Sequence, residues 1–119
     1  MHPTADMPDL APSIYRQRLV IEGTCADPIS PAQIEQYLSG LSEVCGMRTL
    51  LAPVTHHSER YGWAGWVHWE ASGAHFYAWD DPYPFFSVDI YTCKAFDPSC
   101  AIQYTGDFFK ADRVVSKEF

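Results

Sequence analysis

Residues 63–79 read Trp-Ala-Gly-Trp-Val-His-Trp-Glu-Ala-Ser-Gly-Ala-His-Phe-Tyr-Ala-Trp, and this stretch carries a clear strand pattern. It contains two runs rich in aromatic residues, 63–70 and 74–79, joined by the short connection Ala71-Ser72-Gly73. Aromatic residues favour strands, and small residues between two such runs are typical of a tight turn. The stretch therefore predicts two consecutive antiparallel strands.

Further strand patterns lie on both sides of this hairpin. Upstream, residues 16–23 read Arg-Gln-Arg-Leu-Val-Ile-Glu-Gly, and residues 48–54 form a second apolar run. Downstream, residues 85–92 and 112–118 are rich in β-branched and aromatic residues, and the loop 80–84 precedes the first of them. These four runs predict four more strands, six in all.

The first helix is marked at both ends. Ser30 is a good N-cap, Pro31 suits the first turn, and Gln33 completes a capping box. Gly46 is typical of a helix end. Four apolar residues at helical spacing predict the buried face of this helix: Ile34, Leu38, Leu41 and Val44.

A second helix is predicted to begin at Asp97-Pro98, where a capping residue is again followed by proline. Its apolar residues are Ala101, Ile102, Phe108 and Phe109. The order of elements predicts an α/β fold, a two-layer sandwich of a mostly antiparallel sheet with two helices on one face. Residues 15–119 are expected to form this single domain. Residues 1–14, with three prolines and no periodicity, are expected to be a flexible N-terminal arm.

The composition restricts the partners and the location. The formal charge is -7 and the pI about 5.0, with no cluster of Lys and Arg, which disfavours nucleic acid and anionic membrane surfaces. No apolar run approaches the roughly 20 residues of a membrane span, and the first residues lack the features of a signal peptide. We therefore expect a cytoplasmic protein without nucleic-acid or membrane partners.

The cysteines and histidines give no metal motif. Four cysteines lie far apart without a C-x-x-C pair and are expected as reduced thiols: Cys25, Cys45, Cys93 and Cys100. Four histidines fit no metal-binding spacing and are interpreted as surface or strand residues: His56, His57, His68 and His75. No metal is expected.

Three segments resemble the bacterial S-adenosylmethionine (AdoMet) decarboxylases. Residues 55–65 read T-H-H-S-E-R-Y-G-W-A-G, beside the family's S-H-K-F-E-x-x-G-x-S-G. Residues 71–79 read A-S-G-A-H-F-Y-A-W, beside E-S-H-x-x-x-H-T-W. Residues 88–93 read V-D-I-Y-T-C, beside V-D-I-F-T-C, and Asp97-Pro98 follows as in the family. The resemblance implies the AdoMet decarboxylase fold across nearly the whole domain.

The resemblance also implies a reaction. In the family, the serine of E-S-H attacks its own preceding peptide bond, the chain splits, and the serine becomes a pyruvoyl group. That carbonyl forms a Schiff base with the substrate and acts as the electron sink for decarboxylation. Ser72 occupies this position, and Cys93 matches the cysteine that donates a proton in the decarboxylation.

The residues around these two positions depart from the family. The glutamate before the serine is Ala71 here, the histidine after it is Gly73, and the second histidine is Tyr77. The upstream serine of G-x-S-G is Ala64. A tyrosine, with a reference pKa near 10, is a much poorer acid than an imidazolium at neutral pH. We therefore expect an uncleaved chain without a cofactor, and a pyruvoyl group from Ser72 only if the chain is processed.

The resemblance implies substrate-binding residues as well. Trp79 matches the tryptophan that stacks on the adenine, whereas the phenylalanine of its other side appears as Ser58, for which Tyr61 is a candidate substitute. Asp80 and Asp81 follow Trp79 and are candidates for binding ribose hydroxyls or an ammonium group. Three further tryptophans are interpreted as packing residues: Trp63, Trp66 and Trp69.

Three functions remain open at this point. The first is an uncleaved AdoMet lyase acting by elimination or cyclisation, which needs no electron sink because the sulfonium is a good leaving group; Glu70 or Tyr77 is the candidate base. The second is a pyruvoyl-dependent AdoMet decarboxylase of polyamine biosynthesis, processed slowly with the help of Tyr77 or His75. The third is a non-catalytic AdoMet-binding partner or regulator of an active relative.

A homodimer or a higher homo-oligomer is expected in each case. Members of the family build their sites near a subunit interface. In addition, the aromatic content of 15% exceeds what one small core needs.

Overall fold

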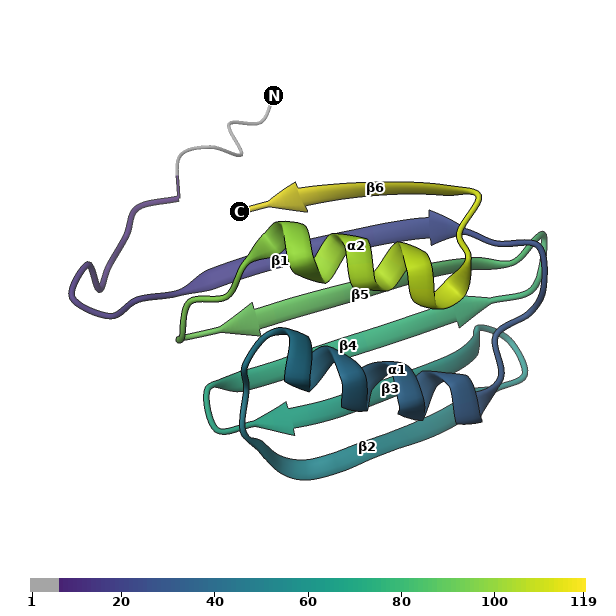
Figure 1. Ribbon diagram of the computed structural model, residues 1–119, viewed down its shortest axis with the longest axis horizontal. Helices are drawn as coiled ribbons and strands as arrows, with labels where there is room; N and C mark the ends of the chain where they lie inside the picture. The colour runs from purple at the N-terminus through teal and green to yellow at the C-terminus, as the bar shows by residue number, and fades with distance from the viewer. Residues whose placement is uncertain (1–6) are drawn as a thin grey trace.

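The computed structural model describes residues 7–119 and contains six strands and two helices (Figure 1). The elements in chain order are β1 (Gln17–Thr24), α1 (Pro31–Val44), β2 (Thr49–Ser58), β3 (Gly62–Trp69), β4 (Ser72–Trp79), β5 (Phe85–Thr92), α2 (Pro98–Phe109) and β6 (Arg113–Glu118). The predicted order of elements is therefore confirmed.

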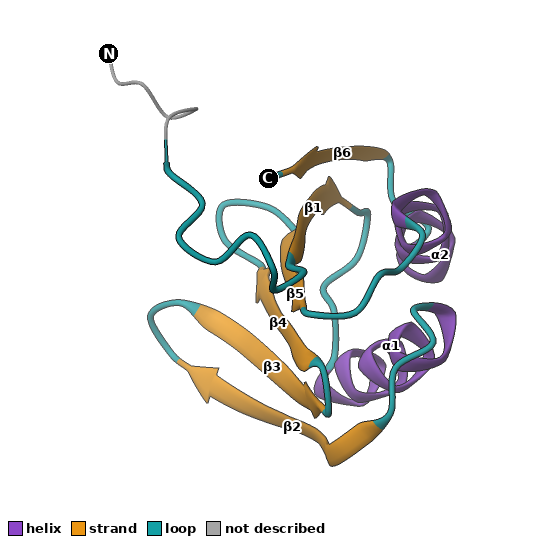
Figure 2. Cartoon of the chain, turned by 90° about the vertical axis from the view of Figure 1, so that its left-hand side faces the viewer, coloured by secondary structure: helices purple, strands orange, loops and turns teal. Residues whose placement is uncertain are grey.

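The strands form one sheet in the order β2-β3-β4-β5-β1-β6, and every neighbouring pair is antiparallel. Both helices cover the same face of the sheet and leave the other face open (Figure 2). This confirms the predicted two-layer α/β sandwich. We call the uncovered side the open face.

The core lies between the helices and the sheet. Side chains that are inaccessible to solvent project from alternate positions of four strands, because successive strand residues point to opposite faces. They include Leu19, Ile21, Val67, Trp69, Phe76, Phe86, Val88 and Ile90. The helices meet at Tyr37 of α1, whose hydroxyl lies 2.7 Å from that of Thr105 of α2. Burial raises the pKa of Tyr37 far above its usual range, so this phenol stays neutral.

The ends of α1 are as the sequence predicts. The Ser30 hydroxyl accepts from the Gln33 N–H, and the Gln33 side chain accepts from the Ser30 N–H at 2.8 Å. Gly46, with φ of 68°, follows the helix in a conformation that glycine adopts without strain. Val44 is the exception on the predicted buried face. It is 37% exposed in the last turn, whereas the next residue, Cys45, is buried.

Strand β2 differs most from its predicted bounds. β2 continues to Ser58, four residues past the predicted end, and contains Pro53. It is an edge strand, and a proline is tolerated there because its missing N–H can face away from the ladder.

The predicted turn at Ala71-Ser72-Gly73 is displaced. Trp69 pairs with Ser72, so Glu70 and Ala71 form the turn and Ser72 begins β4. Ser72 has φ of 126°, a region that residues other than glycine rarely occupy. The backbone is therefore strained at Ser72, the residue that matches the family's reactive serine.

The expected N-terminal arm lies partly outside the described residues, which begin at residue 7. Residues 7–14 contain no helix or strand, and the Arg16 guanidinium is 2.7 Å from the Asp9 carboxylate. Within residues 7–119, neither helix has the length and apolar character of a membrane span.

Candidate functional site on the open face

The open face carries polar and aromatic side chains in the middle of the sheet. Rings follow one another along it, with Trp66 and His75 6.1 Å apart, His75 and Tyr77 6.4 Å apart, and Tyr77 and Trp79 6.2 Å apart. Successive residues of a strand point to opposite faces of the sheet. The rings of this row point away from the core, so packing of the core does not explain them. This face is therefore the candidate site.

A first hollow of about 300 Å³ lies beside Ser72. We call it the serine hollow. Its lining residues are Trp66, His68, Ser72, Gly73, His75, Asp89 and Tyr91. This volume is at the lower end of the range for small-molecule sites and accommodates part of a ligand of AdoMet size.

The carboxylate in the serine hollow is already paired. Asp89 accepts two hydrogen bonds from Arg18, at 3.0 Å from Nε and 2.7 Å from Nη2. These hydrogen bonds raise the pKa of Arg18 further above its usual value. Charge on Asp89 is thereby compensated within the sheet.

Cys93 contacts the peptide bond that precedes Ser72. The Ala71 carbonyl oxygen accepts from the Cys93 backbone N–H at 2.9 Å and lies 3.5 Å from its sulfur. The structure therefore brings Ser72 and Cys93 together, as the resemblance implies. Glu70 is in the adjacent turn, where its exposed carboxylate lies 3.8 Å from Arg48, and it does not line the serine hollow.

The backbone leaves no room for a side chain after Ser72. A Cβ atom at Gly73 would collide with the backbone oxygen of Val67 on β3. A side chain at this position, such as the family's histidine, would therefore require the backbones of β3 and β4 to shift.

A second hollow of about 300 Å³ lies at the other end of the open face, and we call it the tryptophan-end hollow. Its lining residues are Glu22, Gly23, Thr24, Phe85, Arg113 and Val115. The Trp79 ring packs 5.3 Å from the Phe85 ring at its border. Glu22 accepts a hydrogen bond of 2.9 Å from the Ser87 hydroxyl. This end combines an indole with a carboxylate.

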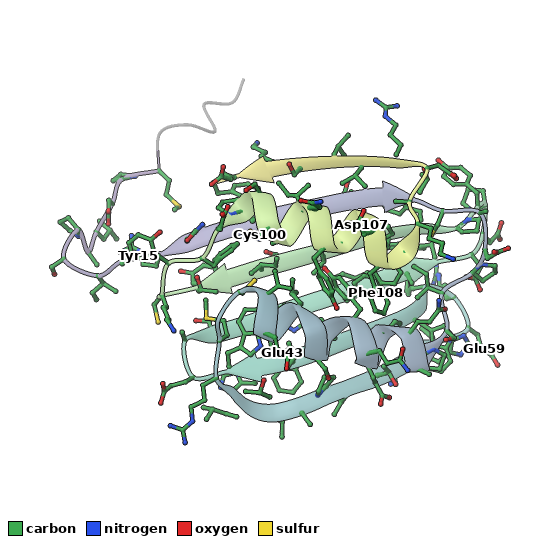
Figure 3. All side chains as sticks on the ribbon, in the orientation of Figure 1. Tyr15, Glu43, Glu59, Cys100, Asp107 and Phe108 are labelled. Atoms are coloured by element: carbon green, nitrogen blue, oxygen red, sulfur yellow. The ribbon has the colours of Figure 1, made fainter. Side chains whose placement is uncertain are left out.

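The predicted site residues fall into two groups. Figure 3 labels Tyr15, which precedes β1, and Glu59, in the turn after β2, at opposite ends of the sheet. Ser72 lies toward the Tyr15 end and Trp79 toward the Glu59 end, because β4 runs the length of the sheet between them. At about 3.3 Å per residue, seven residues of strand separate them by about 23 Å.

The other predicted binding residues belong to the tryptophan end. Tyr61 is 63% exposed in the turn before β3, and Asp80 and Asp81 are exposed in the loop after β4. Tyr77 lies two residues before Trp79 on the open face. One chain therefore does not bring Ser72 and Trp79 to the same ligand.

Several site residues escaped the sequence analysis, and one interpretation was wrong. Trp66 lines the serine hollow and is not a core residue, because its position alternates with the buried Val67 and Trp69. The missed residues are Arg18, Glu22, Asp89 and Tyr91. His68 and His75 were interpreted as surface or strand residues, and His75 was otherwise named only as an aid to processing. In β5, Ser87, Asp89 and Tyr91 alternate with the buried Val88 and Ile90, and this alternation is a signal that could have revealed the open face. Among the described residues, no three His, Cys, Asp or Glu side chains are grouped as metal ligands.

The fold and these hollows define a two-layer α/β protein whose candidate site lies on an uncovered antiparallel sheet. The family model of S-adenosylmethionine decarboxylase matches residues 19–119. The chain belongs to the S-adenosylmethionine decarboxylase family. It is also similar to the crystal structure of the adenosylmethionine decarboxylase from Aquifex aeolicus VF5, with a TM-score of 0.69 and 20% identity over 89% of each chain. At that identity the likeness supports the fold alone. No match was found among curated proteins.

Proposed function

We propose that this chain is an uncleaved cytoplasmic enzyme that binds AdoMet and breaks it down as a lyase, by elimination or cyclisation. The observation that carries the proposal is the closed space at Gly73, where a side chain would collide with the Val67 backbone. The histidine that directly follows the serine in the family has no place there, and the family's second histidine, the proton donor of processing, is Tyr77 in this chain. A function that needs no self-cleavage agrees best with this geometry.

The chemistry needs only the substrate's own leaving group. When the bond between the sulfonium sulfur and the γ-carbon of the amino-acid chain breaks, its electron pair neutralises the sulfur and releases methylthioadenosine. In cyclisation, a carboxylate oxygen of the substrate forms the new bond to the γ-carbon. In elimination, a base takes a proton from the β-carbon, and the electron pair of that C–H bond forms the second bond between the β- and γ-carbons. Tyr77 is the predicted base that lies on the open face, whereas Glu70 is exposed in a turn.

The two hollows suit the two ends of AdoMet. At the tryptophan end, Trp79 offers an indole face to the adenine and Glu22 offers a carboxylate to the ribose hydroxyls. The serine hollow is left for the amino-acid end. Since about 23 Å of strand separates Ser72 from Trp79, the complete site requires the tryptophan end of a second copy to face the serine hollow of the first.

This arrangement predicts a homodimer or a higher oligomer in solution. Light scattering at micromolar concentration should give a mass at least twice the 13.5 kDa of one chain. A lone 13.5 kDa species that still binds AdoMet would show that the site is contained in one chain.

The chain should also remain intact. Denaturing mass spectrometry of the purified protein is expected to give one polypeptide of about 13.5 kDa. Two fragments meeting between Ala71 and Ser72, one of them with a pyruvoyl terminus, would contradict the proposal and establish processing.

Turnover distinguishes the candidate reactions directly. Incubation with AdoMet should yield methylthioadenosine without carbon dioxide, and Ser72→Ala should retain most of this activity because the hydroxyl takes no part in it. Release of carbon dioxide that is lost in Ser72→Ala would identify a decarboxylase. Binding without turnover by the wild type would leave a non-catalytic AdoMet-binding protein.

One observation favours the pyruvoyl-dependent decarboxylase of polyamine synthesis as a second candidate. The Ala71 carbonyl accepts from the Cys93 N–H, and Ser72 is held at φ of 126°. Backbone strain of this kind stores about 1–3 kcal/mol. A polarised carbonyl beside a strained residue would assist cleavage of the bond between them. The intact-mass measurement separates the two candidates.

A further inference from the structure

The serine hollow differs in charge character from the rest of the chain. The protein carries a formal charge of -7, yet the side chains lining this hollow are mostly hydrogen-bond donors. His68, His75 and Tyr91 each present an N–H or O–H group. Asp89, the one carboxylate among the seven lining residues, is neutralised by two hydrogen bonds from Arg18. A cluster of donors around a compensated carboxylate is suited to an anionic group.

Two histidines are held in place by one tryptophan. The Trp66 ring centroid lies 6.1 Å from that of His68 and 6.1 Å from that of His75. His68 follows Trp66 on the same strand by two residues, and His75 is the residue paired with Trp66 across β3 and β4. Both imidazoles therefore stand on the open face, on either side of the indole, and line the same hollow.

We propose that the serine hollow binds the carboxylate of the substrate's amino-acid end through His68 and His75, with Trp66 positioning both rings. This inference rests on the proposed function, because it takes AdoMet or a close analogue as the ligand. Imidazole N–H groups donate to a carboxylate in either protonation state of the ring. In this arrangement the carboxylate stays on the ligand, and the two histidines fix the position of the carboxylate.

The test compares two inert ligands that differ only in the carboxylate. S-adenosylhomocysteine has the carboxylate and lacks the reactive sulfonium, and its decarboxylated counterpart, S-adenosyl-3-thiopropylamine, lacks both. Calorimetric titration of the wild type should show tighter binding of S-adenosylhomocysteine by about 10- to 100-fold, the range for charge-assisted hydrogen bonds.

Phenylalanine at either histidine keeps a ring against Trp66 and removes the donors. In His68→Phe and in His75→Phe the preference for S-adenosylhomocysteine should fall by about 10-fold, while the affinity for S-adenosyl-3-thiopropylamine stays the same. His57→Phe is the matched control, because the His57 ring packs against the Trp63 ring, with centroids 4.6 Å apart, and lines neither hollow. Its preference should equal that of the wild type.

The outcomes separate this inference from the proposed function. Equal affinity of the wild type for both ligands, or an unchanged preference in both histidine variants, would overturn the carboxylate site and leave AdoMet binding intact. Failure of the wild type to bind either ligand or AdoMet at millimolar concentration would overturn both. A variant that is misfolded by circular dichroism is replaced by His68→Leu or His75→Leu, to which the same criteria apply.

Discussion

Replacing Trp69 by alanine is expected to lower the free energy of unfolding by about 3–5 kcal/mol, the range for removing a large aromatic side chain from a core. Trp69 is inaccessible to solvent and is among the largest buried side chains of the protein. Its Nε1 donates to the Ser42 hydroxyl of α1 at 2.7 Å. The substitution removes this bond and leaves a cavity between β3 and α1. Urea denaturation followed by circular dichroism measures the loss.

Trp66→Ala is the matched control on the same strand. Trp66 lies on the open face, where the substitution removes contacts with His68 and His75 but opens no cavity in the core. We expect it to lower the free energy of unfolding by less than about 1.5 kcal/mol. Equal losses for the two variants would mean that Trp66 is buried in solution, as a second copy packed over the open face would make it. Repeating the measurement across protein concentrations identifies that case, because only an interface makes the loss concentration-dependent.

Replacing Trp79 by alanine is expected to weaken the binding of AdoMet or S-adenosylhomocysteine by about 5- to 150-fold. Stacking of a base on an aromatic ring contributes about 1–3 kcal/mol, and each 1.4 kcal/mol changes the dissociation constant tenfold. The ring is half-buried at the end of β4, next to Phe85. Calorimetric titration of the wild type and the variant gives the ratio.

Trp79→Phe and Tyr83→Ala are the controls for this measurement. Phenylalanine retains a flat ring and should recover most of the affinity, whereas Tyr83 is an exposed aromatic in the neighbouring loop that lines neither hollow. An unchanged affinity in Trp79→Ala would remove the stacking role and leave the AdoMet assignment standing. A loss in Tyr83→Ala as large as that in Trp79→Ala would place the adenine over the loop instead.

The sequence predicted the elements well where local interactions decide them. The capping box at Ser30 and Gln33 and the glycine that ends α1 act within a few residues, so the helix could be located without the rest of the chain. The hairpin of β3 and β4 was predicted from its aromatic runs, but its turn was misplaced by one residue. The pairing of Trp69 with Ser72 depends on which side chains the helices cover, and the turn residues themselves do not record it.

The site was predictable only in part, for a related reason. Ser72 and Cys93 could be named from the resemblance, and the fold places them together. The serine hollow could not be predicted, because its residues come from β3, β4 and β5 and become neighbours only through the register of the sheet. Trp66 shows the difficulty, because a tryptophan in a strand can point to the core or to the open face. Its side became clear only when the structure showed that Val67 and Trp69 point to the core.

The order of strands and helices along the chain, the two-layer architecture and the departures from the family around Ser72 could all be read from the residues. The lack of space at Gly73 could not, since the obstacle is the Val67 backbone of the adjacent strand. The placement of Ser72 and Trp79 at opposite ends of β4 likewise depends on the folded sheet. Helix caps and strand patterns are local in the chain, whereas close approach between strands and distance along a sheet are set by contacts among residues far apart in sequence.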